Sequence, residues 1–189
     1  MTHLSPRPST PSLTSSSPLR FRQPRRRDGA RLLRLVRACP PLETNSQYLY
    51  LLLTEHFSQT CMLVEQDDDI VGFISAYRRP DAMHTLFIWQ VAVRPDMRGR
   101  GLGLDMLRAL LSRPSLHAIS ALEATVAPDN RASRRLFEGF ARERDWSCEA
   151  TPLFAPDDFG GEVHEPEFLL RLRRKPLVSA PHPEEATWS

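Results

Sequence analysis

The loop from Arg98 to Gly103, with the sequence Arg-Gly-Arg-Gly-Leu-Gly, constrains the fold of this chain more than any other segment. An apolar run from Phe87 to Val93 precedes the loop, and a run with helical periodicity from Leu102 to Leu111 follows it. The segment therefore predicts a strand, a tight loop and a helix. The glycines let backbone N–H groups approach an anion closely, and the start of the helix directs its positive dipole end to the same point. With two arginines adding fixed charge, the loop is typical of a cradle for a pyrophosphate.

The spacing of the glycines narrows the choice of pyrophosphate ligand. The loop lacks the GxGxxG spacing of dinucleotide-binding folds, and no Gly-Lys-Ser/Thr follows it as in a P-loop. A Gly-rich connection with only a structural role is the alternative that these residues leave open. The pattern Arg-x-x-Gly-x-Gly after Val-Ala-Val resembles the acetyl-CoA motif of the GNAT N-acetyltransferases.

Composition argues against several classes of protein. No apolar run approaches the roughly 18–20 residues that a membrane-spanning helix needs, so we expect no membrane partner. The three cysteines and six histidines show no metal-ligand spacing, so we expect no metal, and unpaired cysteines suit reduced thiols in the cytoplasm. Residues 1–27 hold six arginines and no acid, so with a total of +2 the rest of the chain carries −4. An acidic body argues against a nucleic-acid partner, although the arginine-rich leader keeps a nucleic-acid binder as an alternative.

The chain divides into one domain and two tails. Residues 1–18 are rich in Ser, Thr and Pro and are predicted to be a disordered leader, because they cannot bury enough apolar surface to offset the entropy of ordering. Residues 175–189 are predicted to be a flexible tail. Residues 19–174 form the predicted domain, and Asp28 is the predicted N-cap of its first helix.

Hydrophobic periodicity predicts an alternation of strands and helices in that domain. The strands are expected at residues 19–23, 60–65, 70–78, 85–93, 121–126, 144–150 and 167–173. The helices are expected from residue 28 to the Cys39-Pro40-Pro41 stop and at residues 46–56, 101–111 and 130–139. This order suits an α/β fold in which helices flank a mixed, mostly antiparallel sheet, and it matches the order of elements in the GNAT N-acetyltransferase fold.

The GNAT resemblance implies which residues contact acetyl-CoA. The strand before the loop would pair with the pantetheine arm, and the loop would hold the diphosphate. The segment from Pro128 to Phe137 resembles the Asn-x-x-Ala/Ser-x-x-Leu-Tyr helix of the family, in which the Asn contacts the CoA arm. Asn130 has that role or is only a helix N-cap, and Phe137 replaces the Tyr that protonates the leaving thiolate in many members. The implied contacts are Val91, Val93, Arg98, Gly99, Arg100, Gly101, Gly103 and Asn130.

Glu123 is the candidate catalytic base. Strand alternation over residues 121–126 places Glu123 on one face with Thr125, opposite Leu122 and Ala124. An acid in a short central strand is unusual unless it has a role or a partner. We expect a partly buried carboxylate with a raised pKa that accepts the proton of the reacting amine through water. The alternative is a glutamate at the surface end of the strand.

Three further segments resemble one group of GNAT enzymes, the L-2,4-diaminobutyrate N4-acetyltransferases of ectoine biosynthesis. They are Cys39 to Tyr50, Leu86 to Val93 and Phe159 to Glu165, and the resemblance covers about residues 20–173. It implies acetylation of the γ-amine of diaminobutyrate with acetyl-CoA, in a cytoplasmic homodimer, on the route to an osmoprotectant. Another GNAT enzyme for a small amine or amino acid, and a non-catalytic acyl-CoA-binding module, are the alternatives.

The same resemblance implies a set of residues around the amine substrate. A glutamate could hold an ammonium group, polar side chains at a helix start could hold the polar ends of the substrate, and aromatic side chains could form a wall. The family usually has Asp where Glu43 stands. The alternatives are an N-cap cluster at residues 44–46, a core role for Trp89 and a solvated loop position for His164. The implied contacts are Glu43, Thr44, Asn45, Tyr48, Trp89, Gln90 and His164.

Overall fold

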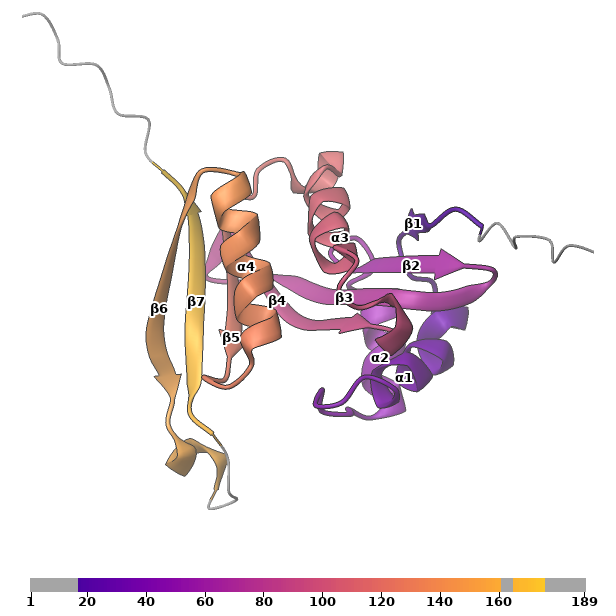
Figure 1. The fold of residues 1–189 in the computed structure, drawn as a ribbon, viewed down its shortest axis with the longest axis horizontal. Helices are drawn as coiled ribbons and strands as arrows, with labels where there is room; N and C mark the ends of the chain where they lie inside the picture. The colour runs from indigo at the N-terminus through magenta and orange to yellow at the C-terminus, as the bar shows by residue number, and fades with distance from the viewer. Residues whose placement is uncertain (1–16, 161–164, 176–189) are drawn as a thin grey trace, which may run out of the picture.

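The computed structural model describes residues 17–160 and 165–175, and its fold is a single twisted sheet covered by helices (Figure 1). The strands are β1 (Arg20–Arg22), β2 (Met62–Gln66), β3 (Asp69–Arg79), β4 (Ala82–Val93), β5 (Ala121–Val126), β6 (Trp146–Phe154) and β7 (Glu167–Arg174). Their order in the sheet is β1-β2-β3-β4-β5-β7-β6, and every neighbouring pair is antiparallel except β4 and β5. The predicted α/β class, the mostly antiparallel sheet and the order of the elements are therefore confirmed.

Helices cover both faces of the sheet. The α-helices are α1 (Gly29–Arg37), α2 (Gln47–Glu55), α3 (Leu102–Leu111) and α4 (Arg131–Glu143). Short 3₁₀ turns occupy Arg26–Asp28, Pro95–Met97, Pro114–Leu116 and Pro156–Phe159. The larger core lies under α3 and α4 and includes Ile88 and Leu122, whereas a second core under α1 and α2 includes Phe73 and Ala92. Ile88 and Ala92 belong to the same strand, so β4 contributes side chains to both cores.

The sheet splits between β4 and β5, the parallel pair among the described strands. β4 and β5 are paired at just three positions, which end at Phe87 opposite Glu123, and each strand then continues without the other to Val93 and Val126. On its other side, β4 has a register shift against β3, because Ser75 pairs with Gln90 and Ala76 pairs with Ile88. Trp89 is therefore the extra residue of a β-bulge. The bulge bends β4 close to the point where the two strands separate.

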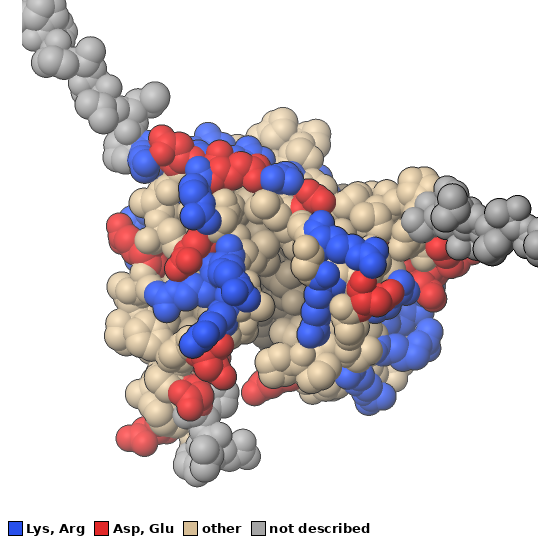
Figure 2. Space-filling view, viewed as in Figure 1, with Lys and Arg blue, Asp and Glu red and all other residues tan. Residues whose placement is uncertain are grey.

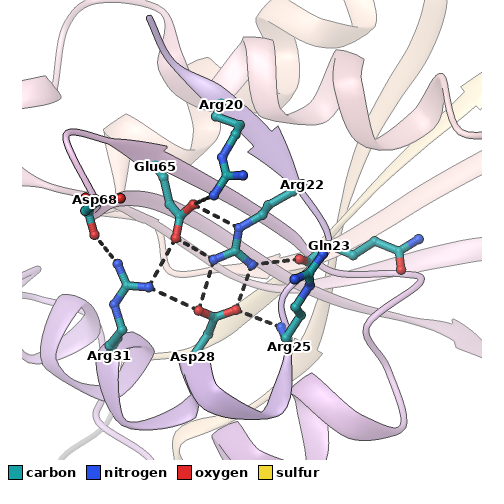
Figure 3. Close-up of polar contacts among 8 residues, drawn as sticks. All are labelled: Arg20, Arg22, Gln23, Arg25, Asp28, Arg31, Glu65 and Asp68. Carbon is teal, nitrogen blue, oxygen red and sulfur yellow. Dashed lines mark hydrogen bonds and ion pairs between the residues drawn. The ribbon is translucent and has the colours of Figure 1, made fainter. Parts of the chain in front are cut away.

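The N-terminal strand and helix are held by a buried network of charges (Figure 3). Arg22 donates five hydrogen bonds, to Glu65, to Asp28 and to the carbonyl of Gln23. Arg31 on α1 bonds the same two carboxylates, and Arg20 bonds Glu65. Asp28 precedes α1 as predicted, but its side chain does not cap that helix, because these arginines and the N–H of residue 25 occupy both oxygens.

The arginines at residues 20–27 were expected to form a basic leader, and the structure corrects that expectation in part. Arg20 pairs with Glu65, Arg22 pairs with Asp28 and Glu65, and Arg26 pairs with Glu55. These three arginines are therefore bound within the domain and do not form a free basic leader. A pairing between residues about 30–45 positions apart has no signature in the sequence itself. The predictions for most of the leader and for nearly all of the tail, at residues 1–16 and 176–189, lie outside the described residues.

Candidate active site

A cavity of about 510 Å³ lies beside the end of β4, beyond the last position at which β4 pairs with β5. Four segments line it: the turn after α1, the end of β4, the loop into α3, and α4. Figure 2 shows a hollow near the middle of this face with Lys and Arg side chains on both of its rims. The lining residues are Cys39, Pro40, Pro41, Leu42, Val91, Val93, Met97, Arg98, Gly99, Gly101, Leu102, Gly103, Leu104, Asn130, Ala132, Ser133, Arg135, Leu136 and Gly139. Apolar walls with a few polar groups are typical of a pocket for a small molecule.

The loop into α3 presents a row of backbone donors to this cavity. Gly99 and Gly101 have φ angles of +74° and +82°, the left-handed conformation that glycine adopts at least cost. The backbone N–H groups of residues 99–103 donate no hydrogen bond to any described residue. The first amides of α3 are among them, so the positive end of the helix dipole adds to the row. This arrangement fits a diphosphate, as the glycine spacing predicted.

The residues implied as acetyl-CoA contacts differ in whether they line the cavity. Seven of the eight line the cavity, and only Arg100 does not. Gly103 has a packing role as well, because a Cβ at that position would lie 3.2 Å from Leu136 of α4. Arg98 lines the cavity while it donates to the carbonyls of Val93 at 3.2 Å and Pro40 at 3.3 Å. Arg98 therefore also ties the end of β4 to the turn after α1.

Asn130 is a helix N-cap and also lines the cavity in which the acetyl-CoA contact was expected. Its Oδ1 accepts a hydrogen bond from the N–H of Ser133 at 3.1 Å, so it is the N-cap of α4, and it also lines the cavity. Phe137, which stands where many GNAT enzymes have Tyr, is 2% exposed in the larger core. It is not among the residues that line the cavity. The structure thus assigns this position to packing.

Gln90 connects the bulge of β4 to the start of α2. Its amide nitrogen donates to the carbonyl of Glu43 at 2.9 Å, and its amide oxygen accepts from the hydroxyl of Tyr50 at 3.3 Å. The backbone N–H of Gln90 donates to the hydroxyl of Ser75 at 3.1 Å. Gln90, Tyr50 and Ser75 are all buried. Tyr50 and Ser75 were not among the predicted site residues: Tyr50 ends the segment Cys39 to Tyr50 without an assigned role, and Ser75 lies in a strand without a recognisable motif.

The remaining residues implied around the amine come from the start of α2 and from the bulge of β4, and none of the described ones lines the cavity. Residues 43–45 precede α2, whose N-cap is Ser46 with its hydroxyl accepting from the N–H of Leu49 at 3.3 Å. Tyr48 in the first turn of α2 is 68% exposed, and Trp89 in the bulge is 45% exposed. Trp89 is therefore not a core residue. His164 lies outside the described residues.

Glu123 is buried at the point where β4 and β5 separate, and two arginines hold it. Its side chain is 3% exposed, with Oε2 accepting from Nη1 of Arg79 at 2.7 Å and Oε1 accepting from Nε of Arg171 at 2.6 Å. Burial by itself raises the pKa of Glu123, but the hydrogen bonds and charges of Arg171 and Arg79 outweigh burial and hold the pKa below its usual range. The expected raised pKa is therefore wrong.

The partners of Glu123 explain why the direction of the pKa shift could not be predicted. Arg171 is the cross-strand neighbour of Glu123 on β7, and Arg79 is the last residue of β3. Alternation in the sequence places Arg171 on one face, opposite Leu170 and Leu172. Only the register of β5 against β7 brings it to Glu123, and register between distant strands is not encoded in a local pattern.

The described part of the chain contains neither a candidate metal cluster nor a helix long and apolar enough to span a membrane. No three His, Cys, Asp or Glu side chains in residues 17–160 and 165–175 group in a way that could hold a metal ion. None of the described helices meets the length and hydropathy needed to cross a bilayer.

Comparison with known proteins places this geometry among acetyltransferases. Residues 30–140 match the acetyltransferase (GNAT) family. The chain is 46% identical over 170 residues to the L-2,4-diaminobutyric acid acetyltransferase of Bordetella parapertussis, a match that covers 88% of this chain and 90% of the relative. It is 44% identical over 161 residues to the protein of the same name from Vibrio cholerae, covering 85% of this chain and 91% of that relative.

A solved structure is similar over nearly the same length. It is the diaminobutyrate acetyltransferase EctA from Paenibacillus lautus, in complex with its substrate L-2,4-diaminobutyric acid and coenzyme A. The two folds agree with a TM-score of 0.80 at 41% sequence identity, and the match covers 82% of this chain and 95% of the other.

Proposed function

Because the chain belongs to the GNAT family of acetyltransferases, and within it to the L-2,4-diaminobutyric acid acetyltransferases, we propose that it transfers the acetyl group of acetyl-CoA to the γ-amine of L-2,4-diaminobutyrate. The observations that carry this proposal are the cavity beside the separated end of β4, with the unengaged backbone N–H groups of residues 99–103 in the loop that lines it, and Glu123 on β5 at the last position paired with β4. The first feature suits an acyl donor that carries a diphosphate, and the second suits proton transfer from an amine.

Acetyl-CoA is held along the separated strands. The N–H groups of residues 99–103 and the start of α3 bind its diphosphate, with Arg98 adding charge. The edge of β4 that faces the split has no partner strand among the described residues beyond Phe87, so its backbone at Val91 and Val93 is available to the amides of the pantetheine arm. Asn130 contacts the same arm from the start of α4. The thioester then lies toward the bulge at Trp89, where a backbone N–H stabilises the developing oxyanion.

Glu123 acts as the proton acceptor. At neutral pH the γ-amine is mostly an ammonium ion, which cannot attack a thioester until it loses a proton. Each oxygen of Glu123 accepts only one hydrogen bond from the described residues, so each keeps capacity for the ammonium or for a bridging water. The low pKa of Glu123 keeps it ionised throughout the physiological range. The free amine attacks the carbonyl, the C–N bond forms and the C–S bond breaks. The nitrogen gives its second proton to water, and the thiolate takes a proton from water because Phe137 has none to give, so no net hydroxide forms. The proton on Glu123 then returns to solvent.

The substrate chain is held from the rim of α2 and from the bulge. Tyr48 and Trp89 form its wall, and Gln90 positions that wall through its bonds to Glu43 and Tyr50. The residues that we propose for this site are Glu43, Thr44, Asn45, Tyr48, Trp89, Gln90 and His164.

The reaction itself is tested by identifying the product. The protein is incubated with acetyl-CoA and L-2,4-diaminobutyrate, and the acetylated nitrogen is located by mass spectrometry and NMR. We expect acetylation of the γ-nitrogen only. Acetylation of the α-nitrogen, or faster turnover of another amine from a panel of diamines and amino acids, would contradict the substrate assignment.

Three wider features complete the proposal. The product serves ectoine synthesis, and the enzyme works in the cytoplasm, where acetyl-CoA is available and where its three unpaired cysteines stay reduced.

The protein forms a homodimer through the sheet edge at β6, where residues 149–154 are all exposed and Leu153 and Phe154 leave 43% and 45% of their surfaces uncovered. Light scattering of the purified protein tests the dimer, and a mass of one chain would contradict it.

A further inference from the structure

Among the described residues, the guanidinium group of Arg171 on β7 has a single hydrogen-bond partner. Its Nε donates to Glu123 at 2.6 Å, while its two terminal nitrogens bond no described residue. Glu149 lies directly opposite on β6, yet no ion pair joins the two side chains. The Arg171 side chain is 31% exposed, so the terminal nitrogens can be reached from solvent.

Arg79, the second arginine on Glu123, differs from Arg171 in this respect. It binds both oxygens of Asp81, at 3.0 Å and 2.5 Å, and also donates to Glu123 at 2.7 Å. Arg79 is therefore engaged on every nitrogen, and Arg171 on only one. A guanidinium held by its Nε keeps both terminal NH₂ groups in the fork geometry that suits a carboxylate.

The position of Arg171 in the sheet places that open fork beside the reaction. Phe87, Glu123 and Arg171 are consecutive partners across β4, β5 and β7, at the last pair before β4 and β5 separate. They lie on the face away from α3 and α4. The core under α1 and α2 lies on that same face, and its strand residues come from β2, β3 and β4, so it does not extend over β5 and β7.

We propose that Arg171 binds the α-carboxylate of the amino-acid substrate, with Glu123 holding the guanidinium in position. This inference rests on the proposed function, since only an amino-acid substrate supplies the carboxylate. Three carbon atoms separate the carboxylate of diaminobutyrate from its γ-nitrogen, so one substrate molecule can present its amine to Glu123 and its carboxylate to Arg171. The pair would thus recognise both ends of the substrate and favour diamino acids over simple diamines.

The test compares two substrates that differ only in the carboxylate. 1,3-Diaminopropane is L-2,4-diaminobutyrate without that group. Because Arg171 also bonds Glu123, we expect Arg171→Gln to lower kcat/KM for both amines, and to lower it about 10- to 100-fold further for diaminobutyrate through a higher KM, the effect of losing charge-assisted hydrogen bonds to the carboxylate. Arg171→Lys keeps the charge without the fork and should fall between the two. Arg173→Gln, on the same face of β7 and exposed, is the matched control and should change neither substrate.

Each outcome decides between named alternatives. A wild-type enzyme that does not acetylate diaminobutyrate would remove the proposed function and this inference together. Equal losses on both substrates in Arg171→Gln, or no loss on diaminobutyrate, would overturn the inference alone. If wild-type turnover of 1,3-diaminopropane is too slow to measure, calorimetric titration of the enzyme–CoA complex with the two amines gives the same comparison as dissociation constants.

Discussion

Glu65 on β2 and Glu123 on β5 are both buried carboxylates held by arginines, but the two clusters differ in how completely their polar groups are used. Glu65 accepts four hydrogen bonds, from Arg20, Arg22 and Arg31, and Arg22 uses all five of its N–H donors. Glu123 accepts two hydrogen bonds, and one of its partners, Arg171, uses a single donor.

The difference indicates that the same residue types serve two purposes. Glu65, with four accepted hydrogen bonds, and Arg22, with all five donors used, have little left to offer a ligand, whereas Arg20 at the exposed edge of the cluster uses a single donor. The cluster stabilises the way β1 and α1 pack on the sheet. A network with unused donors and acceptors, placed where the sheet splits, can take part in binding and proton transfer. Burial and a lowered pKa are common to both carboxylates, so neither property distinguishes a catalytic glutamate from a structural one.

The largest expected effect comes from removing the basicity of Glu123. Glu123→Gln keeps the size of the side chain, and a positioned base is worth about 10²–10⁴-fold in rate, so we expect a loss of that size in kcat at pH 7. Activity should recover partly as the pH rises, because free amine then accumulates without the base. Steady-state rates from pH 6 to pH 10 measure this, together with acetyl-CoA binding, which should persist. Full activity of the variant at pH 7 would show that another group accepts the proton.

Changes in the cluster around Glu65 and Asp28 should lower the stability of the protein and leave its activity unchanged. Arg22→Met leaves two buried carboxylates without their main partner, which costs about 3–5 kcal/mol of unfolding free energy. For a domain of this size that corresponds to a fall in Tm of roughly 6–20 °C. Thermal unfolding followed by circular dichroism measures the fall, with Arg173→Gln as a surface control. A large rise in KM for either substrate in the folded variant would show that the network also supports the site.

The two arginines of the loop into α3, Arg98 and Arg100, should differ in their effect on acetyl-CoA binding. Both were expected to contact acetyl-CoA, but Arg98 lines the cavity and Arg100 does not. Losing one charge-assisted contact to phosphate costs on the order of 1.5–3 kcal/mol, so Arg98→Ala should raise the acetyl-CoA KM about tenfold or more. The amine KM should change little. Arg100→Ala is the matched variant, and an equal effect from both would contradict the placement of Arg98.

Protonation of Glu65 in acid should lower the Tm by less than the Arg22→Met substitution does. The hydrogen bonds from Arg22 lower the pKa of Glu65 to about 2, below its value in the unfolded chain. The stabilisation is therefore complete above the unfolded-state pKa of about 4.3 and is lost as the pH falls toward 2. Wild-type Tm should drop by more between pH 5 and pH 2.5 than the Tm of Arg22→Met. A parallel drop in both proteins would show that other carboxylates dominate acid unfolding.

The sequence predicted the site to the extent that its signals are local. Glycine spacing indicated the amide row at residues 99–103, and period-two alternation placed Glu123 on the face opposite Leu122. What could not be predicted depends on contacts between distant strands. The partners of Glu123 follow from the register of β5 against β7 and from the end of β3, and the partners of Arg22 follow from the docking of β1 on β2. For the same reason the arginines near residue 22 resembled a free basic leader until their partners were known.

A matched pair of variants tests whether the Glu65 cluster serves stability and the Glu123 cluster serves catalysis. Glu65→Gln and Glu123→Gln make the same change in each carboxylate, and Tm and kcat for diaminobutyrate are measured for both. We predict that Glu65→Gln lowers the Tm and keeps the kcat of the folded enzyme, whereas Glu123→Gln lowers the kcat and lowers the Tm by less, because Glu123 accepts two hydrogen bonds and Glu65 accepts four. A loss of kcat in both variants, or a loss of stability without a loss of kcat in Glu123→Gln, would contradict the distinction between the two clusters.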